Sequence, residues 1–153
     1  MFRSFPLLLL VFLSALPALS TAQNQRTTET GFTRFAEHTV YHSVFSSTAI
    51  RPEIAVLHGL TRAGNQMLVN VALVSNDRQF GGEPAHVSGS VSNLLNQRRE
   101  LNFKTIDEGD VVYYLAPVRV TEQDTLHFTL KVAPESGASA YEVKFTKRVY
   151  VNH

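Results

Sequence analysis

The 153-residue sequence has no cysteine and no tryptophan, and its 14 Lys and Arg residues against 13 Asp and Glu residues leave a formal net charge of only +1. The lack of cysteine excludes a disulfide scaffold, Cys-ligated zinc, an iron–sulfur cluster and a Cys nucleophile. The small net charge argues against a nucleic-acid binder, which usually carries a basic excess. The length predicts one domain. Composition therefore narrows the function by exclusion and does not indicate a specific activity.

The N-terminal segment is the one long apolar stretch. Arg3 supplies a positive start, Leu7–Leu16 form an apolar run, Pro17 ends it, and Ser20 and Ala22 place small residues at a cleavage site. This is the three-part pattern of a secretory signal peptide. The run is shorter than the roughly 20 residues of a membrane-spanning helix. We therefore expect export to the periplasm or beyond, with no stable membrane insertion once the signal is removed.

Three segments follow from this pattern. Residues 1–22 are predicted to be the signal peptide, and the polar residues 23–30 a flexible leader. Residues 31–153 are predicted to form a single domain. Loss of Arg3 leaves 13 basic and 13 acidic residues, so the mature domain is formally neutral.

The mature region is dominated by short runs in which apolar and polar residues alternate, as in β-strands with one buried face. Turn-forming residues separate them, and the short connections between the third, fourth, fifth and sixth runs predict an antiparallel meander. The sequence therefore predicts an all-β fold, an immunoglobulin-like antiparallel β-sandwich of about seven strands. The seven runs are Phe35–Ser46, Met67–Ser75, Val87–Leu95, Arg99–Ile106, Val111–Val120, Thr125–Val132 and Glu142–Val151.

One segment departs from this alternation. Arg51–Gly59 has Pro52 at a helix-start position, Glu53 in the first turn and Gly59 as a stop signal, which predicts about two turns of helix. The predicted core consists of the in-phase apolar positions of the strands. They are Phe45, Val69, Val71, Leu73, Val91, Leu101, Phe103, Tyr113, Leu115, Leu126, Phe128, Leu130, Val143 and Phe145.

Histidines are the first candidates for chemistry. His38 and His42 lie in a β-branched and aromatic segment, which favours a strand. On a strand they share one face but lie roughly 13 Å apart, too far to hold one metal ion. We therefore predict no metal site and no cofactor. A metal chaperone built on His38, His42 and His58 is the weaker alternative.

Nucleophile and phosphate-binding motifs are absent: there is no Gly-x-Ser-x-Gly elbow, no Gly-x-Gly-x-x-Gly and no Walker loop. We predict no catalytic residues and therefore no enzymatic activity. The favoured function is an exported binding or accessory module with a protein partner in the cell envelope and no nucleic-acid partner.

A cluster of polar residues around the predicted helix is the strongest candidate for a structural network or a binding site. These residues could form a structural polar network, in which Arg62 folds back to Glu53 or onto helix-end carbonyls and Asn70, on the adjoining strand, finds buried partners. They could instead form a binding surface, so that a small-ligand carrier or an enzyme using the Arg51–Asn65 region is the alternative function. The candidate residues are Glu53, His58, Arg62, Asn65 and Asn70.

The stretch Tyr41–Leu73 resembles the signature of a bacterial exported family called domain of unknown function 4426. The resemblance implies an export signal but no activity and no catalytic residues. His58, Leu60 and Ala63 depart from the expected Tyr, Ile and Ser. The matching residues are Phe45, Ser47, Pro52, Glu53, Ile54, Ala55, Gly59, Arg62, Asn65, Val69 and Asn70.

Overall fold

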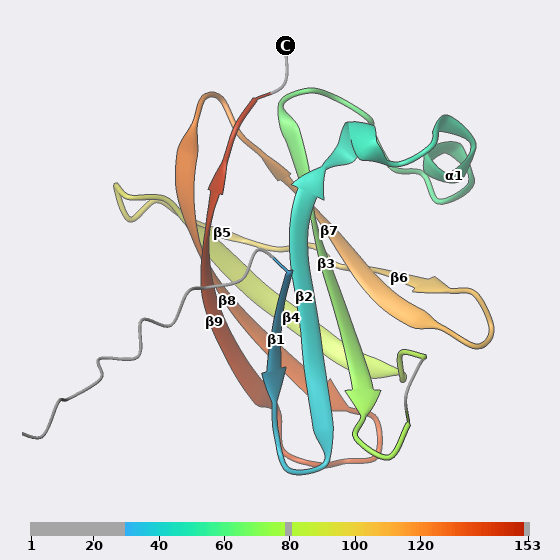
Figure 1. Ribbon diagram of the computed structural model, residues 1–153. Coiled ribbons are helices and arrows are strands. Elements are labelled where there is room, and N and C mark those ends of the chain that lie inside the picture. Colours follow the sequence, from blue (N-terminus) through green and yellow to red (C-terminus); the bar gives the residue numbers. More distant parts are fainter. Residues whose placement is uncertain (1–29, 79–80, 152–153) are drawn as a thin grey trace, which may run out of the picture.

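Two antiparallel sheets face each other in the computed structural model, which describes residues 30–78 and 81–151 (Figure 1). The five-stranded sheet has the order β1-β2-β3-β7-β6, and the four-stranded sheet has the order β5-β4-β8-β9. The strands are β1 (Thr30–Arg34), β2 (His38–Ser46), β3 (Gln66–Ser75), β4 (Ala85–Ser92), β5 (Arg98–Glu100), β6 (Lys104–Asp107), β7 (Val112–Arg119), β8 (Asp124–Pro134) and β9 (Tyr141–Val149).

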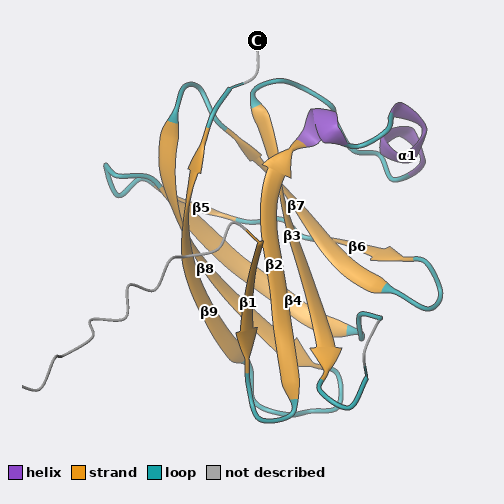
Figure 2. Ribbon diagram, viewed as in Figure 1, coloured by secondary structure: helices purple, strands orange, loops and turns teal. Residues whose placement is uncertain are grey.

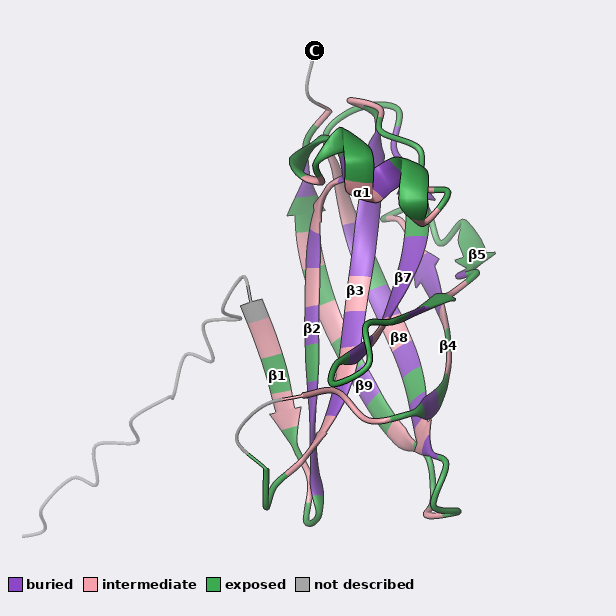
Figure 3. Ribbon diagram, turned by 90° about the vertical axis from the view of Figure 1, so that its right-hand side faces the viewer, coloured by how far each residue is buried: buried purple, intermediate pink, exposed green. Residues whose placement is uncertain are grey.

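The core lies between the sheets, where alternate residues of each strand point inward. In β8, Leu126, Phe128 and Leu130 are at most 1% exposed, whereas the intervening residues face outward. The purple stripes of Figure 3 show this alternation along the strands. The all-β sandwich predicted from the period-two pattern is confirmed, and its immunoglobulin-like connectivity stays a prediction.

Two of the nine strands come from one predicted run. The run Arg99–Ile106 divides into β5 and β6, which belong to different sheets. Leu101 lies between them, is buried, and donates its backbone N–H to Gly89 O at 2.8 Å. The alternation of Leu101 and Phe103 stops at Lys104 and Thr105, which are both exposed, and the next buried residue, Ile106, is out of phase with them. The predicted run continued across this change of phase, and the break was therefore missed.

The predicted meander is wrong at one turn. Thr121–Gln123 connects β7 to β8, and these strands lie in opposite sheets. The hairpins on either side of the predicted fourth run do form, and Gly109 in the β6–β7 turn has φ 84°, which favours glycine.

Most of the predicted core is confirmed. The exceptions are Phe45 and Tyr113, which are only half-buried on the outer face, and Leu115, which is buried on that same face. The inner positions of β7 are instead Val112, Tyr114, Ala116 and Val118, because this strand is apolar on both faces and gives no phase. Nine predicted residues belong to the core cluster, and Phe103 and Phe145 pack against it.

The predicted helix is present as α1 (Pro52–Leu57), preceded by the 3-10 turn η1 (Ser47–Ala49). Pro52 opens α1, and Gly59 has φ 59° just beyond its end. The helix projects from one end of the sandwich (Figure 2), and only Ala55 in it is buried. Val56 and Leu57 are therefore left 82% and 73% exposed.

The predicted signal peptide lies outside the described residues, as does the predicted leader except for its last residue, Thr30, which begins β1. None of the described helices has the length and apolar character that crossing a membrane requires.

Candidate functional site

The predicted polar residues near α1 are held by separate contacts. Glu53 is exposed, and within the described part of the chain no ion pair joins it to Arg62. Arg62 Nη2 instead donates to Thr48 O at 3.0 Å. Asn65 contributes its backbone carbonyl, which accepts from Val120 N at 2.9 Å.

The two remaining candidates, His58 and Asn70, also have separate surroundings. His58 is half-buried, and its backbone oxygen accepts a hydrogen bond from Lys104 Nζ. The side-chain oxygen Oδ1 of Asn70 is buried without a hydrogen-bond partner. Four of the five residues thus lie in the segment between β2 and β3, whereas Asn70 lies mid-way along β3, and the structure does not bring their side chains together.

Ser47 organises this end of the molecule. Its side chain is fully buried, its Oγ donates to Ala63 O at 3.1 Å, and the same Oγ accepts from Ala63 N at 2.9 Å. Gln66 Nε2 also donates to Thr61 O at 3.0 Å. These hydrogen bonds fix the segment 47–66 through its backbone. The sequence named Ser47 only as a residue of the family signature and gave it no role, because a serine that bonds a backbone 16 residues away leaves no local pattern.

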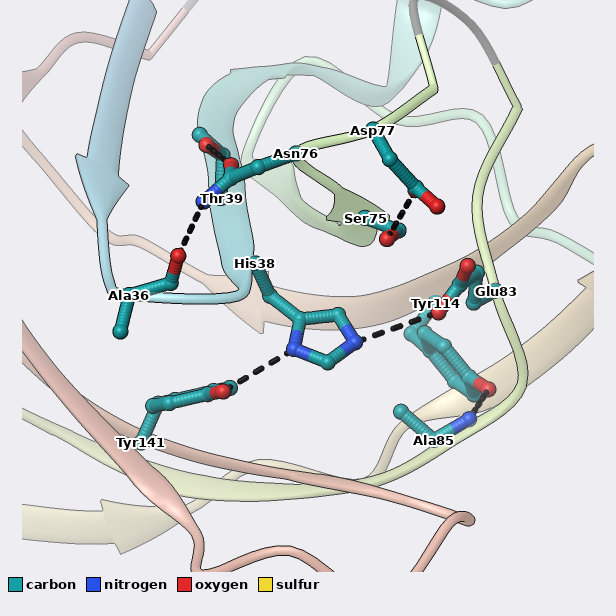
Figure 4. Close-up of polar contacts among 10 residues, drawn as sticks. All are labelled: Ala36, His38, Thr39, Ser75, Asn76, Asp77, Glu83, Ala85, Tyr114 and Tyr141. Atoms are coloured by element: carbon teal, nitrogen blue, oxygen red, sulfur yellow. Dashed lines mark hydrogen bonds and ion pairs between the residues drawn. The ribbon is translucent and has the colours of Figure 1, made fainter.

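A second polar cluster, which we call the His38 corner, lies where β2 begins. It consists of His38, Glu83 and Tyr141 (Figure 4). His38 Nδ1 lies 2.9 Å from Tyr141 Oη, and its Nε2 lies 3.3 Å from Glu83 Oε2. The Tyr141 ring stacks on Phe35 with centroids 4.2 Å apart. The corner therefore joins β2, β9 and the segment before β4.

Neighbouring hydrogen bonds stiffen the His38 corner. Asn76 accepts from Thr39 Oγ1 at 2.7 Å and donates to Phe35 O at 2.9 Å. The pKa of Asp77 is lowered, first because the Ser75 hydroxyl donates to its carboxylate. Both ring nitrogens of His38 are engaged, so this arrangement is suited to holding the chain in place. The sequence placed His38 and His42 on one strand face, but the predicted core residue Phe45 turned that face outward, whereas the structure turns it towards the core. The partners of His38 were not predicted.

His42, unlike His38, is held by ring stacking. It is buried, and its ring stacks on Phe145 with centroids 4.0 Å apart, while Phe145 stacks on Phe128 at 4.7 Å. On its other side lies Gly31, where an added Cβ would come within 2.1 Å of the His42 ring. Burial lowers the pKa of His42, so the fold favours its neutral form.

An exposed aromatic pair lies across β1 and β2, at the β1 side of the five-stranded sheet. Phe32 on β1 is 61% exposed, Tyr41 on β2 is 43% exposed, and their ring centroids lie 5.8 Å apart. On its other side, β1 has no neighbouring strand among residues 30–78 and 81–151. We call this surface the β1 edge. The sequence did not predict this edge, because the first predicted strand run begins at Phe35 and β1 lies entirely before that residue.

Comparison with known proteins places these features in a family context. The family model described as "Domain of unknown function (DUF4426)" matches residues 32–152. A search of curated proteins gave no match. A crystal structure of a DUF4426 family protein from Pseudomonas aeruginosa PAO1 is similar, with a TM-score of 0.74 and 28% identity, covering 82% of this chain and 98% of that one.

More distant structures share the fold. The copper-bound variant of FetP from uropathogenic Escherichia coli strain F11 has a TM-score of 0.58 and 15% identity, covering 82% of this chain and 97% of FetP. The same protein as isolated, expressed recombinantly in the E. coli periplasm, gives the same score and identity and is covered to 96%.

Proposed function

We propose that this chain, which belongs to the DUF4426 family, is an exported, non-enzymatic binding module that recognises a protein partner in the cell envelope through the β1 edge. One observation carries the proposal: Phe32 is exposed on β1, an outermost described strand of its sheet, and lies beside the exposed Tyr41 of the adjacent strand β2. Aromatic side chains that are exposed beside each other are typical anchors of protein interfaces.

The geometry of the β1 edge suits strand addition. An outermost strand offers a row of backbone donors and acceptors that a partner strand can pair with, while side chains beside it supply specificity. Natural sheets usually protect such edges with charged residues. β9, the outermost strand of the other sheet, has this protection, since Lys144 and Arg148 face outward from it and Lys144 pairs with Glu142 at 2.8 Å. The aromatic pair of the β1 edge gives no such protection.

Export supports a partner in the envelope. The N-terminal segment has the composition of a signal peptide, and the distantly similar FetP was expressed in the periplasm. N-terminal sequencing of the exported protein should therefore begin near Gln23.

The similarity to copper-bound FetP raises copper carriage as a competing function, but the residues here do not fit it. His38 uses both ring nitrogens in the His38 corner, and the ring of His42 lies between Gly31 and Phe145. No group of three or more His, Cys, Asp or Glu residues suited to a metal ion occurs in the described part of the chain. Calorimetric titration of tag-free protein with copper or zinc should show no tight one-to-one binding. Submicromolar binding abolished by His42→Ala would contradict this proposal.

A cross-linked pull-down from envelope extract tests the partner. The double variant Phe32→Ser, Tyr41→Ser should lose the captured protein while its thermal unfolding stays close to that of the wild type, because both side chains are exposed. The matched control is Leu94→Ser, Leu95→Ser, which removes two residues that are 66% and 78% exposed in the β4–β5 turn. Equal capture by both variants and the wild type would overturn the proposal.

A further inference from the structure

Strand β1 is anchored less firmly than the other long strands of its sheet. Its five residues pair with β2 and with no other strand of the described chain, and β1 stands at the margin of the sandwich in Figure 3. None of residues 31–34 is fully buried. A short strand with few buried contacts can open while the rest of a domain stays folded. The attachment of β1 therefore depends on its pairing with β2 and on what it packs against there.

Beneath β1 lies the ring of His42. Gly31 and His42 are partners in the register, and a Cβ built at Gly31 would overlap Cε1 and Nε2 of that ring. The ring also stacks on Phe145, and His42 is only 7% exposed. Phe145 is held in turn by its stacking on the buried Phe128, whereas β1 is an outermost strand. Of the two neighbours that cover His42, β1 is therefore the one that can move and admit water.

The elements of the five-stranded sheet offer no acid to a charged His42. Its ring nitrogens have no hydrogen-bond or ion-pair partner among residues 30–78 and 81–151. β1 and β3 contain no acidic residue, and the one cation of β1, Arg34, is exposed. On β2, the titratable residue of the same face is His38, whose Nε2 lies 3.3 Å from Glu83 Oε2. That carboxylate is already engaged.

The facing sheet does not supply an acid either. On β9, the residues of the inward-facing alternation that titrate are Tyr141, whose hydroxyl contacts His38, and Lys147, which would repel a second positive charge. Glu142 belongs to the outward alternation and pairs with Lys144 at 2.8 Å. The one acid of β8, Asp124, lies at the start of that strand, four positions before Phe128. Water is therefore the only partner available to a protonated His42.

We propose that β1 is a pH-sensitive strand, which detaches from β2 when His42 takes up a proton, so that water can solvate the imidazolium. This inference rests on the proposed function, because it assigns a means of regulation to the β1 edge. Detachment removes the outermost paired strand and separates Phe32 from Tyr41. The β1 edge is thus complete at neutral pH and withdrawn in acid.

The direction of the switch follows from linkage. Burial holds the pKa of His42 in the attached state below the ordinary histidine value of about 6.5, and exposure to water returns it towards that value. Attachment is therefore fully favoured above about pH 6.5 and weakens as the pH falls towards the pKa of the attached state. Because one proton is taken up, the ratio of detached to attached β1 rises by at most about tenfold for each pH unit.

Hydrogen–deuterium exchange of the β1 amides in the exported protein, followed by NMR between pH 7 and pH 5, measures this detachment. Each rate is divided by the intrinsic exchange rate at the same pH, which gives a protection factor. We expect the protection of β1 to fall by up to about tenfold per pH unit. It should also be lower than that of β8 and insensitive to about 1 M urea, since a local opening exposes little surface.

Two variants and one control test the role of the ring. His42→Phe keeps a ring beneath Gly31 and cannot titrate, so the protection of β1 should no longer depend on pH. His127→Gln, at an exposed position of β8, should behave as the wild type. Gly31→Ala adds the Cβ that overlaps the ring, so β1 should lose its protection already at pH 7 while β8 stays protected.

Acid-dependent protection of β1 in the wild type and in His127→Gln, but not in His42→Phe, supports the proposal. Protection that does not change with pH, that falls equally in His42→Phe, or that is lost only together with that of β8 overturns it. If His42→Phe does not fold, NMR titration of the His42 ring in the wild type decides. Titration below about pH 6.5 with acid-dependent exchange of β1 supports the proposal, and titration at or above that pH overturns it.

The exchange measurement needs no partner, so the two proposals can fail separately. Loss of partner capture at neutral pH would overturn the proposed function and leave the exchange of β1 unaffected. Exchange of β1 that is independent of pH would overturn the switch alone. If both proposals hold, acid should reduce partner capture by the wild type and leave capture by His42→Phe unchanged.

Discussion

The seam between β2 and β9 and the segment 47–66 are stabilised in different ways. The seam is filled by rings, with His42, Phe145 and Phe128 stacked in succession. The segment is held largely by hydrogen bonds to backbone atoms and leaves Val56 and Leu57 exposed. Side-chain packing therefore dominates the stability of the seam, whereas a few polar contacts fix the shape of the segment. Substitutions in the two regions should separate these contributions.

The largest effect is expected at Phe128, the fully buried end of the ring stack. Phe128→Ala should lower the free energy of unfolding by about 3–5 kcal/mol, because it removes a fully buried aromatic and leaves a cavity. Urea unfolding monitored by circular dichroism measures the loss. A loss below about 1 kcal/mol would contradict the placement of Phe128 in the core.

Ser47 should produce a smaller effect in the other region. Ser47→Ala leaves the backbone N–H and C=O of Ala63 without their partner, which should cost about 1–3 kcal/mol. The matched control is Arg62→Ala, since Arg62 is exposed and makes one hydrogen bond to Thr48 O. We expect about 1 kcal/mol or less for this control. Equal losses of unfolding free energy in Ser47→Ala and Arg62→Ala would show that the buried contact stabilises the segment no more than the exposed one.

Acidification should weaken the seam through His42. Burial holds its pKa in the folded protein below the ordinary histidine value of about 6.5, so the unfolded chain binds the proton more readily. This contribution to stability is fully present above about pH 6.5 and declines as the pH falls towards the folded-state pKa. His42→Phe should remove this part of the pH dependence while retaining a ring against Phe145. The control His127→Gln, at an exposed position, should leave this pH dependence unchanged. Unfolding curves between pH 7 and pH 5 provide the comparison.

The sequence was informative where one strand face is buried and the other is solvated. β8 and β9 were predicted closely because Leu126, Phe128 and Leu130 alternate with polar residues. β7 was not, because Tyr113 and Tyr114 are both apolar enough to face the core. The alternation also carried no information on which sheet a strand joins, so the division of β5 from β6 was missed.

The candidate sites were less predictable than the fold. Alternation placed His38 and His42 on one face of a strand, but the partner Tyr141 is 103 residues from His38 in the chain. Contacts of this kind depend on how the two sheets meet, which local patterns do not encode. The polar residues predicted near α1 were chosen for their proximity in sequence, and their side chains point to different neighbours.

Asn70 provides the smallest expected change. It lies on β3 with its Oδ1 buried and without a hydrogen-bond partner, so this oxygen carries an uncompensated desolvation cost. Asn70→Leu replaces the amide by an apolar group of similar size, and we expect the free energy of unfolding to stay unchanged or to rise by up to about 1 kcal/mol. Asn70→Ala serves as the control, since it removes the amide but also loses packing volume. A loss of more than about 1 kcal/mol in Asn70→Leu would show that the amide makes a stabilising hydrogen bond. That result would support the structural polar network predicted for Asn70 from the sequence.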